Sequence, residues 1–223
     1  AIWPELRENF LGETTGPGRS WNILVFVLFL LAFLHAVLLP NTRDELAYHL
    51  VLPQLWELQQ HWWVTPDNYH LLFPANMEII WGYALAIGGL HLPRLMTFLF
   101  GVMTIGAMRQ WLKDSNFDPW TRGISVAFFL ITPLALIPLS ITYVEWPLLF
   151  FIFLGYWASE HYLQSGQRKY LGLTAITWGL SLGMKYSAIP VIGLLGVEWL
   201  FYLTRRRSIR YAVTAALIVF FGV

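Results

Sequence analysis

Four ionisable residues stand at the ends of apolar segments, although long stretches of chain separate them. They are Asp44, Arg94, Glu145 and Lys185. A charge at membrane depth is costly unless it pairs with another charge or lines a polar cavity. Two acids and two bases brought to one face could hold a phosphate group and a metal ion. The alternative is four interfacial charges that only extend into water.

The segment 41–75, which follows the first apolar run, concentrates further polar and aromatic side chains. Its acids, histidines and tryptophans are Asp44, Glu45, Glu57, Asp67, His49, His61, His70, Trp56, Trp62 and Trp63. The histidines lack the spacing of zinc ligands, so we do not expect a zinc site. The tryptophans are more typical of membrane-interface anchors than of sugar-binding platforms.

Two short helices are predicted within this segment. Thr42 and Glu45 have the spacing of a capping box, and apolar residues follow at helical spacing through Val51. Pro53 ends this first helix and can begin the second, which runs through Trp62. Glu45 therefore has two interpretations that the sequence leaves open: it caps its helix, or it belongs to a binding site.

The composition is typical of a membrane protein. Of the 223 residues, 57% are apolar and 12% charged, against about 45–50% and about 25% in soluble domains. The chain has no cysteine and a net charge of +1, which excludes a disulfide-stapled scaffold and gives no electrostatic case for binding nucleic acid. Disordered, collagen-like and ordinary cytosolic proteins are excluded by the same composition, which leaves a polytopic membrane protein.

Apolar runs near the length that crosses a bilayer, about 20 residues, recur along the chain. They lie near 21–40, 92–112, 123–144, 143–163, 168–184, 186–204 and 211–223. They predict an all-α transmembrane bundle of about seven spans over residues 21–223, preceded by a cytoplasmic segment at 1–20. Since the last run is still apolar at Val223, we expect a partial chain that is incomplete at its C-terminus.

The basic residues set the expected orientation. Eleven of the 14 lie near 7–19, 109–122, 168–169 and 205–210, which we assign to the cytoplasmic side. The loop 41–91 is then extracytoplasmic, and one of the two apolar stretches before residue 112 does not cross the membrane. We predict that 75–88 is a helix on the outer surface, because it is short, contains Glu78 and ends at Gly88-Gly89. The alternative is a short true span.

Five short elements, in order along the chain, resemble the motifs of one enzyme family. They are Asp44-Glu45-Leu46-Ala47-Tyr48-His49-Leu50 followed by Pro53, Phe73-Pro74 with Glu78, Leu92-Pro93-Arg94-Leu95, Tyr143-Val144-Glu145, and Gly183-Met184-Lys185-Tyr186. The set resembles the GT-C glycosyltransferases, and most closely the bacterial relatives of protein O-mannosyltransferases and lipid A aminoarabinose transferases. Glu145 stands where that branch commonly has Asp, so the acid is kept but not its identity.

The resemblance implies a GT-C-like fold in a bacterial inner membrane, with juxtamembrane helices in the first outer loop. It implies an enzyme that moves a sugar from a polyprenyl-phosphate donor to an acceptor on the extracytoplasmic face, usually with inversion at the anomeric carbon. Asp44 would act as general base or bind a divalent metal, Mg²⁺ or Mn²⁺, with Glu145 in support. Arg94 and Lys185 would hold the phosphate, and His49, Glu78 and Glu45 would complete the substrate surroundings.

Two other functions compete with this one. A non-catalytic subunit could keep the fold and serve as a scaffold for other membrane proteins in a larger complex, and the Glu145 difference favours it. A transporter would predict internal repeats or polar residues near mid-membrane, and the sequence has neither in convincing form. A membrane lipid, the polyprenyl-phosphate sugar and membrane protein partners are therefore the expected contacts.

Overall fold

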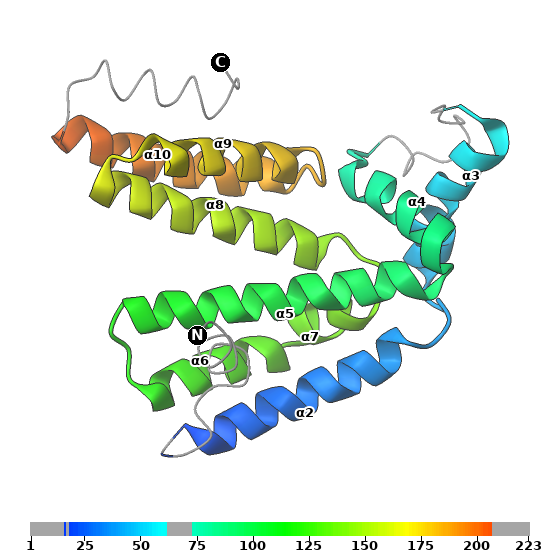
Figure 1. Ribbon diagram of the computed structural model, residues 1–223, viewed down its shortest axis with the longest axis horizontal. Helices are drawn as coiled ribbons and strands as arrows, with labels where there is room; N and C mark the ends of the chain where they lie inside the picture. Colours follow the sequence, from blue (N-terminus) through cyan, green and yellow to red (C-terminus); the bar gives the residue numbers. More distant parts are fainter. Residues whose placement is uncertain (1–15, 17, 62–72, 207–223) are drawn as a thin grey trace. The chain divides into compact units, whose positions relative to one another are not determined.

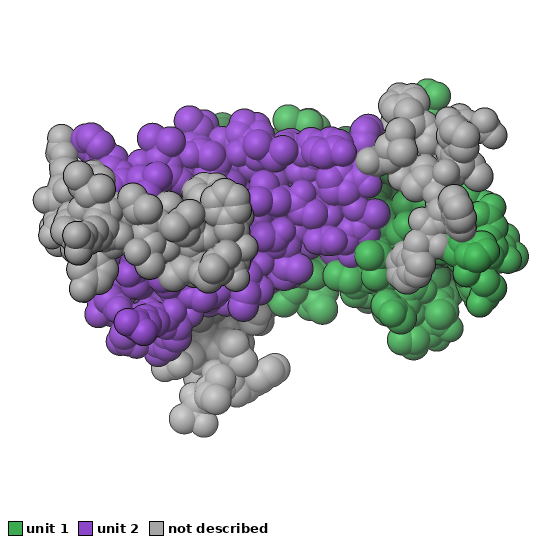
Figure 2. All heavy atoms as spheres, turned by 90° about the horizontal axis from the view of Figure 1, so that it is seen from above, with its two compact units in different colours: residues 1–64, 78–147 green, residues 65–77, 148–223 purple. Residues whose placement is uncertain are grey.

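The computed structural model describes residues 16, 18–61 and 73–206, with the side chains of 203–206 left aside, and within these ranges the chain forms helices and no strand (Figure 1). The all-α prediction is confirmed for this part of the chain. The chain divides into two compact units: unit 1 comprises 1–64 and 78–147, and unit 2 comprises 65–77 and 148–223 (Figure 2). The predicted division into 1–20 and 21–223 concerns a membrane boundary and stays a prediction.

Three helices form the body of unit 1: α2 (Arg19–Ala36), α5 (His91–Asp114) and α6 (Pro119–Ile131), which lie side by side in Figure 1. The buried residues of α2 recur at helical spacing and are Asn22, Val25, Leu28, Ala32 and Ala36. The opposite face is also apolar and exposed, with Phe26, Leu30 and Leu34 on it. A helix that is apolar all round is typical of a membrane span or a deeply buried core.

The apolar run 123–144 does not form one straight span. Helix α6 ends at Ile131, and the chain continues through α7 (Pro133–Leu136) and a 3-10 helix, η3 (Pro138–Ser140), after a bend of 78°. Thr132 is extended, as a residue before proline prefers to be, and Pro133 offers no N–H to continue the helix. The prolines thus break the predicted span.

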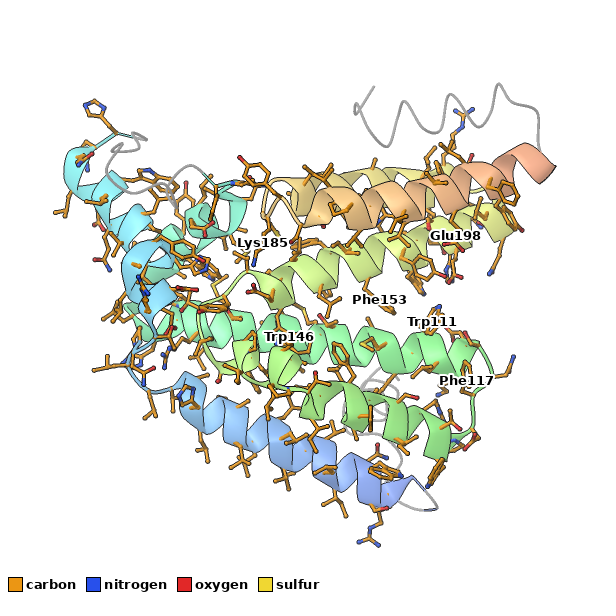
Figure 3. All side chains as sticks on the ribbon, turned by 180° about the vertical axis from the view of Figure 1, so that it is seen from behind. Trp111, Phe117, Trp146, Phe153, Lys185 and Glu198 are labelled. Atoms are coloured by element: carbon orange, nitrogen blue, oxygen red, sulfur yellow. The ribbon has the colours of Figure 1, made fainter. Side chains whose placement is uncertain are left out.

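Side chains of unit 1 fix this broken segment. Trp146 donates its Nε1–H to the carbonyl of Ala135 over 2.9 Å, and its ring meets Phe129 edge-on; Figure 3 labels Trp146. A Cβ on Gly101 of α5 would meet the Leu139 side chain at only 2.1 Å. Glycine at this position therefore lets η3 pack against α5.

The polar end of unit 1 is built by short helices. A π-helix, η1 (Glu45–His49), leads into α3 (Val51–Gln59), and Pro53 lies in the first turn of α3. This agrees with the two predicted helices in number and place, but the second is shorter than the predicted helix through Trp62. Helix α3 ends at Gln59, because Gln60 takes a left-handed conformation with a φ of 53°. Helix α4 (Asn76–Gly88) confirms the helix predicted at 75–88, and it ends at Gly89, whose φ of +62° suits glycine. Its place on a membrane surface stays a prediction.

Unit 2 contains α8 (Glu145–Ser165, whose first three residues belong to unit 1), α9 (Arg168–Leu182) and α10 (Ala188–Arg206). A close approach joins α8 to α9, because a Cβ on Gly155 would lie 2.3 Å from the Trp178 ring. Trp178 donates its Nε1–H to the Ile152 carbonyl over 3.3 Å. Asn76 caps the end of α9, since its backbone N–H donates to the Gly183 carbonyl over 2.9 Å.

The number of membrane spans differs from the expected seven. In the described ranges, only α2 and α5 are long and apolar enough to cross a membrane. Helix α6 and the segment Pro133–Ser140, which are separated by the bend, would add a third span if together they count as one. Helix α9 has only 15 residues, and α8 carries Glu145 at its start and Glu160 near its end, which lowers its apolar content. The last predicted run, 211–223, lies outside the described residues. Apolar helices thus support a membrane protein but not a seven-span count.

Candidate functional site

A buried ion pair between Glu45 and Arg94 lies at the centre of the polar end of unit 1. Arg94 donates from Nε to Glu45 Oε1 over 2.7 Å and from Nη2 to Oε2 over 2.6 Å. Neither side chain is exposed at all. Two parallel hydrogen bonds between a guanidinium and a carboxylate fix both groups in direction as well as in distance.

The remaining donors of Arg94 also meet protein acceptors. Its Nη1 donates to the carbonyls of His35 and Leu38, over 3.3 and 3.1 Å, and its Nη2 donates to Asn41 Oδ1 over 3.0 Å. A guanidinium has five N–H donors, so all five are used within the protein. The phosphate contact expected of Arg94 would require one of these bonds to open. In this structure Arg94 instead ties the end of α2 to η1.

Glu45 accepts from three elements. Besides Arg94, the Thr142 backbone N–H donates to Oε1 over 2.7 Å, and the Thr42 hydroxyl donates to Oε2 over 2.8 Å. Burial raises the pKa of the Glu45 carboxyl, but the hydrogen bonds from Arg94, Thr142 and Thr42 outweigh it and lower the pKa to about 2. Thr42 N also donates to Oε2 over 3.2 Å, so Glu45 both caps its helix and holds Arg94.

Asp44, the residue before Glu45, has a different environment. It is half-buried, and the Tyr143 hydroxyl donates to its Oδ2 over 2.8 Å. No other described residue donates to the Asp44 carboxylate, so its Oδ1 keeps its acceptor capacity. Asp44 is therefore an oriented carboxylate with one oxygen available to a ligand.

Tyr48 shows that further predicted residues belong to the same cluster. Burial raises the pKa of the Tyr48 hydroxyl, and the negative charges of Asp44, Glu145 and Glu78 raise it further. Ring contacts connect the same groups, because the centroid of the His49 ring lies 4.0 Å from that of Tyr48 and 5.5 Å from that of Tyr143. Tyr143 in turn binds Asp44, and His49 pairs with Glu78. Asp44, Glu145 and Glu78 are thus brought together although they lie in three separate segments of the sequence.

His49 and Glu78 form a second buried pair in this cluster. The His49 Nδ1 and Glu78 Oε1 atoms are 2.7 Å apart, and the two side chains are 3% and 5% exposed. The His49 ring meets Trp81 edge-on, with 5.2 Å between the ring centroids. Glu78 Oε2 is buried and has no hydrogen-bond partner in the described part of the chain. A buried polar atom of this kind is typical of a position that binds water or a ligand.

Lys185, the fourth residue expected at the site, belongs to unit 2. It is half-buried in the turn between α9 and α10, where its carbonyl accepts from the Ala188 N–H, and Figure 3 labels it. Its convergence with Asp44, Arg94 and Glu145 stays a prediction.

The sequence did not single out the residues that link this cluster. Tyr143 orients Asp44, the Tyr48 ring contacts the His49 ring, and Asn41 binds Arg94. Both tyrosines lie inside the motif elements quoted above, which is a signal that could have found them. The Thr142 backbone N–H, in contrast, has no signature in the sequence.

The cluster does not assemble a metal centre by itself. In the described ranges, no group of three or more His, Asp or Glu residues is placed to hold a metal ion. Mg²⁺ is commonly held by one or two carboxylates together with substrate phosphates and water. The available oxygen of Asp44 fits one such ligand position, and the predicted metal stays a prediction.

A groove lies between α3 and α4, the latter being the helix that carries Glu78. Its volume is about 360 Å³, and Gly82 allows α4 to approach Pro53 of α3, because a Cβ there would meet the Pro53 ring at 3.3 Å. The groove is lined by Pro53, Trp56, Glu57, Gln60, His61, Ile79, Gly82, Tyr83 and Ala86. The lining combines apolar and aromatic side chains with a few polar ones, as ligand pockets commonly do.

No protein family model matches the chain, and neither a curated protein nor a solved structure matches it. Function is therefore argued from the geometry of the site.

Proposed function

We propose that this protein is a membrane glycosyltransferase that moves a sugar from a polyprenyl-phosphate donor to an acceptor outside the cytoplasm. The observation that carries the proposal is the carboxylate of Asp44, which is held by the Tyr143 hydroxyl and linked through the His49 ring to Glu78. The ordered resemblance to GT-C enzymes supports it, because the clustered residues come from four of the five resembling elements. The apolar helices α2 and α5 support a membrane setting.

In the proposed reaction, the acceptor hydroxyl attacks the anomeric carbon of the sugar. Asp44 takes the hydroxyl proton as the new carbon–oxygen bond forms. The bond between the anomeric carbon and the phosphate oxygen breaks, and its electron pair leaves with the polyprenyl phosphate. The hydrogen bond from Tyr143 keeps the Asp44 carboxylate pointed toward the acceptor.

The other predicted site residues have supporting roles in this proposal. Arg94 and Glu45 fix the backbone next to Asp44, since Glu45 follows Asp44 directly and is bound from α5. Lys185 binds the donor phosphate as a point charge. Glu145 orients the acceptor, and a divalent metal, where it takes part, would use Asp44 as one ligand and neutralise phosphate charge.

Transfer assays with Asp44→Asn test the proposal. The amide keeps the shape of the side chain but cannot take a proton, so we expect a loss of about 10²–10⁴-fold. Transfer would be measured from undecaprenyl-phosphate mannose and undecaprenyl-phosphate aminoarabinose in membranes that contain the full chain. Asp114→Asn, in an exposed acid at the end of α5, is the matched control. Equal transfer by wild type and Asp44→Asn would refute the catalytic role.

A non-catalytic scaffold is the second candidate, and one observation favours it. All five donors of Arg94 are used within the protein, which is the pattern of a structural anchor. The two candidates differ in lipid binding. A transferase should bind undecaprenyl phosphate more tightly than undecaprenol, and Lys185→Ala should remove most of that difference. A scaffold should bind both lipids equally.

A further inference from the structure

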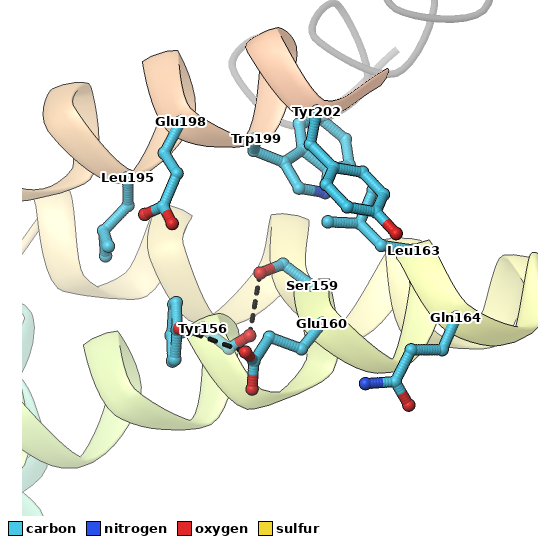
Figure 4. Close-up of a pocket in the computed structure, with 9 residues that line it drawn as sticks. All are labelled: Tyr156, Ser159, Glu160, Leu163, Gln164, Leu195, Glu198, Trp199 and Tyr202. Carbon is cyan, nitrogen blue, oxygen red and sulfur yellow. Dashed lines mark hydrogen bonds between the residues drawn. The ribbon is translucent and has the colours of Figure 1, made fainter. Parts of the chain in front are cut away.

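A second pocket lies within unit 2, between α8 and α10, and the proposed transfer reaction does not use it. Its volume is about 250 Å³ (Figure 4). It is lined by Tyr156, Ser159, Glu160, Leu163 and Gln164 of α8 and by Leu195, Glu198, Trp199 and Tyr202 of α10. Pockets for drug-sized ligands usually measure about 300–1,000 Å³, so this one suits a small head group.

Two carboxylates give the pocket its charge. Glu160 accepts a hydrogen bond of 3.0 Å from the Tyr156 hydroxyl, which holds it in place. Glu198 projects from α10 and lines the same pocket as Tyr156 and Glu160 (Figure 4). Glu198 is exposed, and no described side chain forms an ion pair or hydrogen bond with it. Two negative charges at one cavity favour a cationic ligand.

The aromatic side chains of the pocket favour an organic ammonium group over other cations. Tyr156, Trp199 and Tyr202 line the pocket, and the faces of such rings attract an ammonium group. A primary ammonium also has N–H donors for both carboxylates and for the Gln164 amide oxygen. A divalent metal would instead require more oxygen ligands than the two carboxylates of this pocket supply.

Trp199 supplies an independent observation that points to a ligand. Its side chain is 3% exposed, yet its Nε1–H has no acceptor in the described part of the chain. The indole projects from α10 into the space between the two helices (Figure 4). A buried donor without an acceptor is costly, so an acceptor oxygen on the ligand would satisfy it.

We infer that this pocket binds a primary ammonium group linked to a phosphate ester. The ammonium lies between Glu160 and Glu198, and a phosphate oxygen accepts from Trp199 Nε1–H. An ethanolamine phospholipid and a free phosphoethanolamine compound share this chemistry. The site is separate from the Asp44 cluster, so its occupancy does not depend on the proposed transferase activity.

Lipid retention by the full chain, purified in a neutral maltoside detergent and measured by native mass spectrometry, tests the inference. Phosphatidylethanolamine should be retained, whereas phosphatidylglycerol, which has the phosphate but no ammonium, should not. Glu198→Gln should weaken retention about tenfold, as expected for a lost hydrogen bond to a charged group. Trp199→Phe removes the N–H donor but keeps a ring and should weaken it as well. Asp114→Asn should have no effect.

The source of the ligand is resolved in the same experiment. Displacement of the lipid by soluble glycerophosphoethanolamine would assign the pocket to a free amine, and its failure to compete would assign it to the lipid. Glu198→Asp keeps the charge and should retain most of the binding, which guards against a variant that merely misfolds. Equal retention of phosphatidylglycerol, or unchanged retention by Glu198→Gln, would overturn the inference.

Discussion

The Arg94 network in unit 1 and the Glu198 pocket in unit 2 both contain carboxylates on helical elements. The two regions differ in how deeply these carboxylates are buried and in whether protein groups pair with them. Glu45 is fully buried, and every donor of its partner Arg94 has an acceptor. Glu198 is exposed beside a cavity and has no described cation next to it. A charged group that is fully paired with protein groups holds segments of the chain together, whereas an unpaired charged group at a cavity is available to a ligand.

The same contrast holds between neighbours in the sequence. Asp44 and Glu45 are adjacent acids, yet Glu45 accepts from Arg94, Thr142 and Thr42, whereas Tyr143 is the one described residue that donates to Asp44. Their burial explains the difference, because Glu45 faces the interior and Asp44 is half-buried. We therefore expect substitutions at Glu45 and Arg94 to change mainly the folding stability. Substitutions at Asp44 and Glu198 should change mainly the binding or turnover of ligands.

The largest expected effect comes from Arg94→Met. This change leaves Glu45 buried without its cation, so the free energy of unfolding should fall by about 3–5 kcal/mol. Chemical denaturation of the purified protein in detergent measures it. The double variant Glu45→Gln/Arg94→Met should recover a large part of the loss, because no unpaired charge remains. A loss below about 1 kcal/mol in the single variant would contradict the structural role.

Acid should weaken the same network. The pKa of Glu45 is lowered to about 2 from an ordinary value of 4.5, so its contribution to stability is present above about pH 4.5 and is lost as the pH falls toward 2. The contribution is of the order of 3 kcal/mol. Thermal unfolding followed between pH 5 and about pH 3 should show this decline in the wild type. Glu45→Gln should be less stable at neutral pH and should lack that part of the pH dependence.

Much of the helical framework could be predicted from the sequence, because it depends on local patterns. The apolar runs located α2 and α5, the glycine pair located the end of α4, and the Thr42 and Glu45 spacing predicted the cap. The span count was wrong because length and average apolarity do not reveal breaks. The bend after Ile131 depends on Pro133, which lies inside the single predicted run 123–144.

The partners of the site residues could be predicted less well, because they are not local. Arg94 was expected to bind phosphate, but Glu45, which is 49 residues away in the sequence, accepts two of its hydrogen bonds. Glu198 lies inside the predicted apolar run 186–204, where a single acid does not by itself predict a site. Its pocket requires the side chains of α8, and nothing in the α10 sequence predicts that pairing.

Tyr143→Phe should have an intermediate effect and tests the position of Asp44. It removes one hydrogen bond between half-buried groups, so stability should fall by about 1 kcal/mol. If Asp44 is the general base, transfer should fall through a lower kcat with little change in KM, because the ring that lines the site remains. Asp114→Asn, in an exposed acid at the end of α5 away from these residues in the sequence, is the control. Unchanged transfer by Tyr143→Phe would contradict the proposal that Tyr143 orients the Asp44 carboxylate.

The smallest expected effect on stability belongs to Glu198→Gln. Glu198 is exposed and has no described partner, so its free energy of unfolding without lipid should stay within about 0.5 kcal/mol of the wild type. Added phosphatidylethanolamine should stabilise the wild type by mass action and the variant much less. Thermal unfolding with and without that lipid measures both quantities. A large loss without lipid would instead mean that Glu198 is a structural anchor like Glu45, and the contrast between the two regions would then fail.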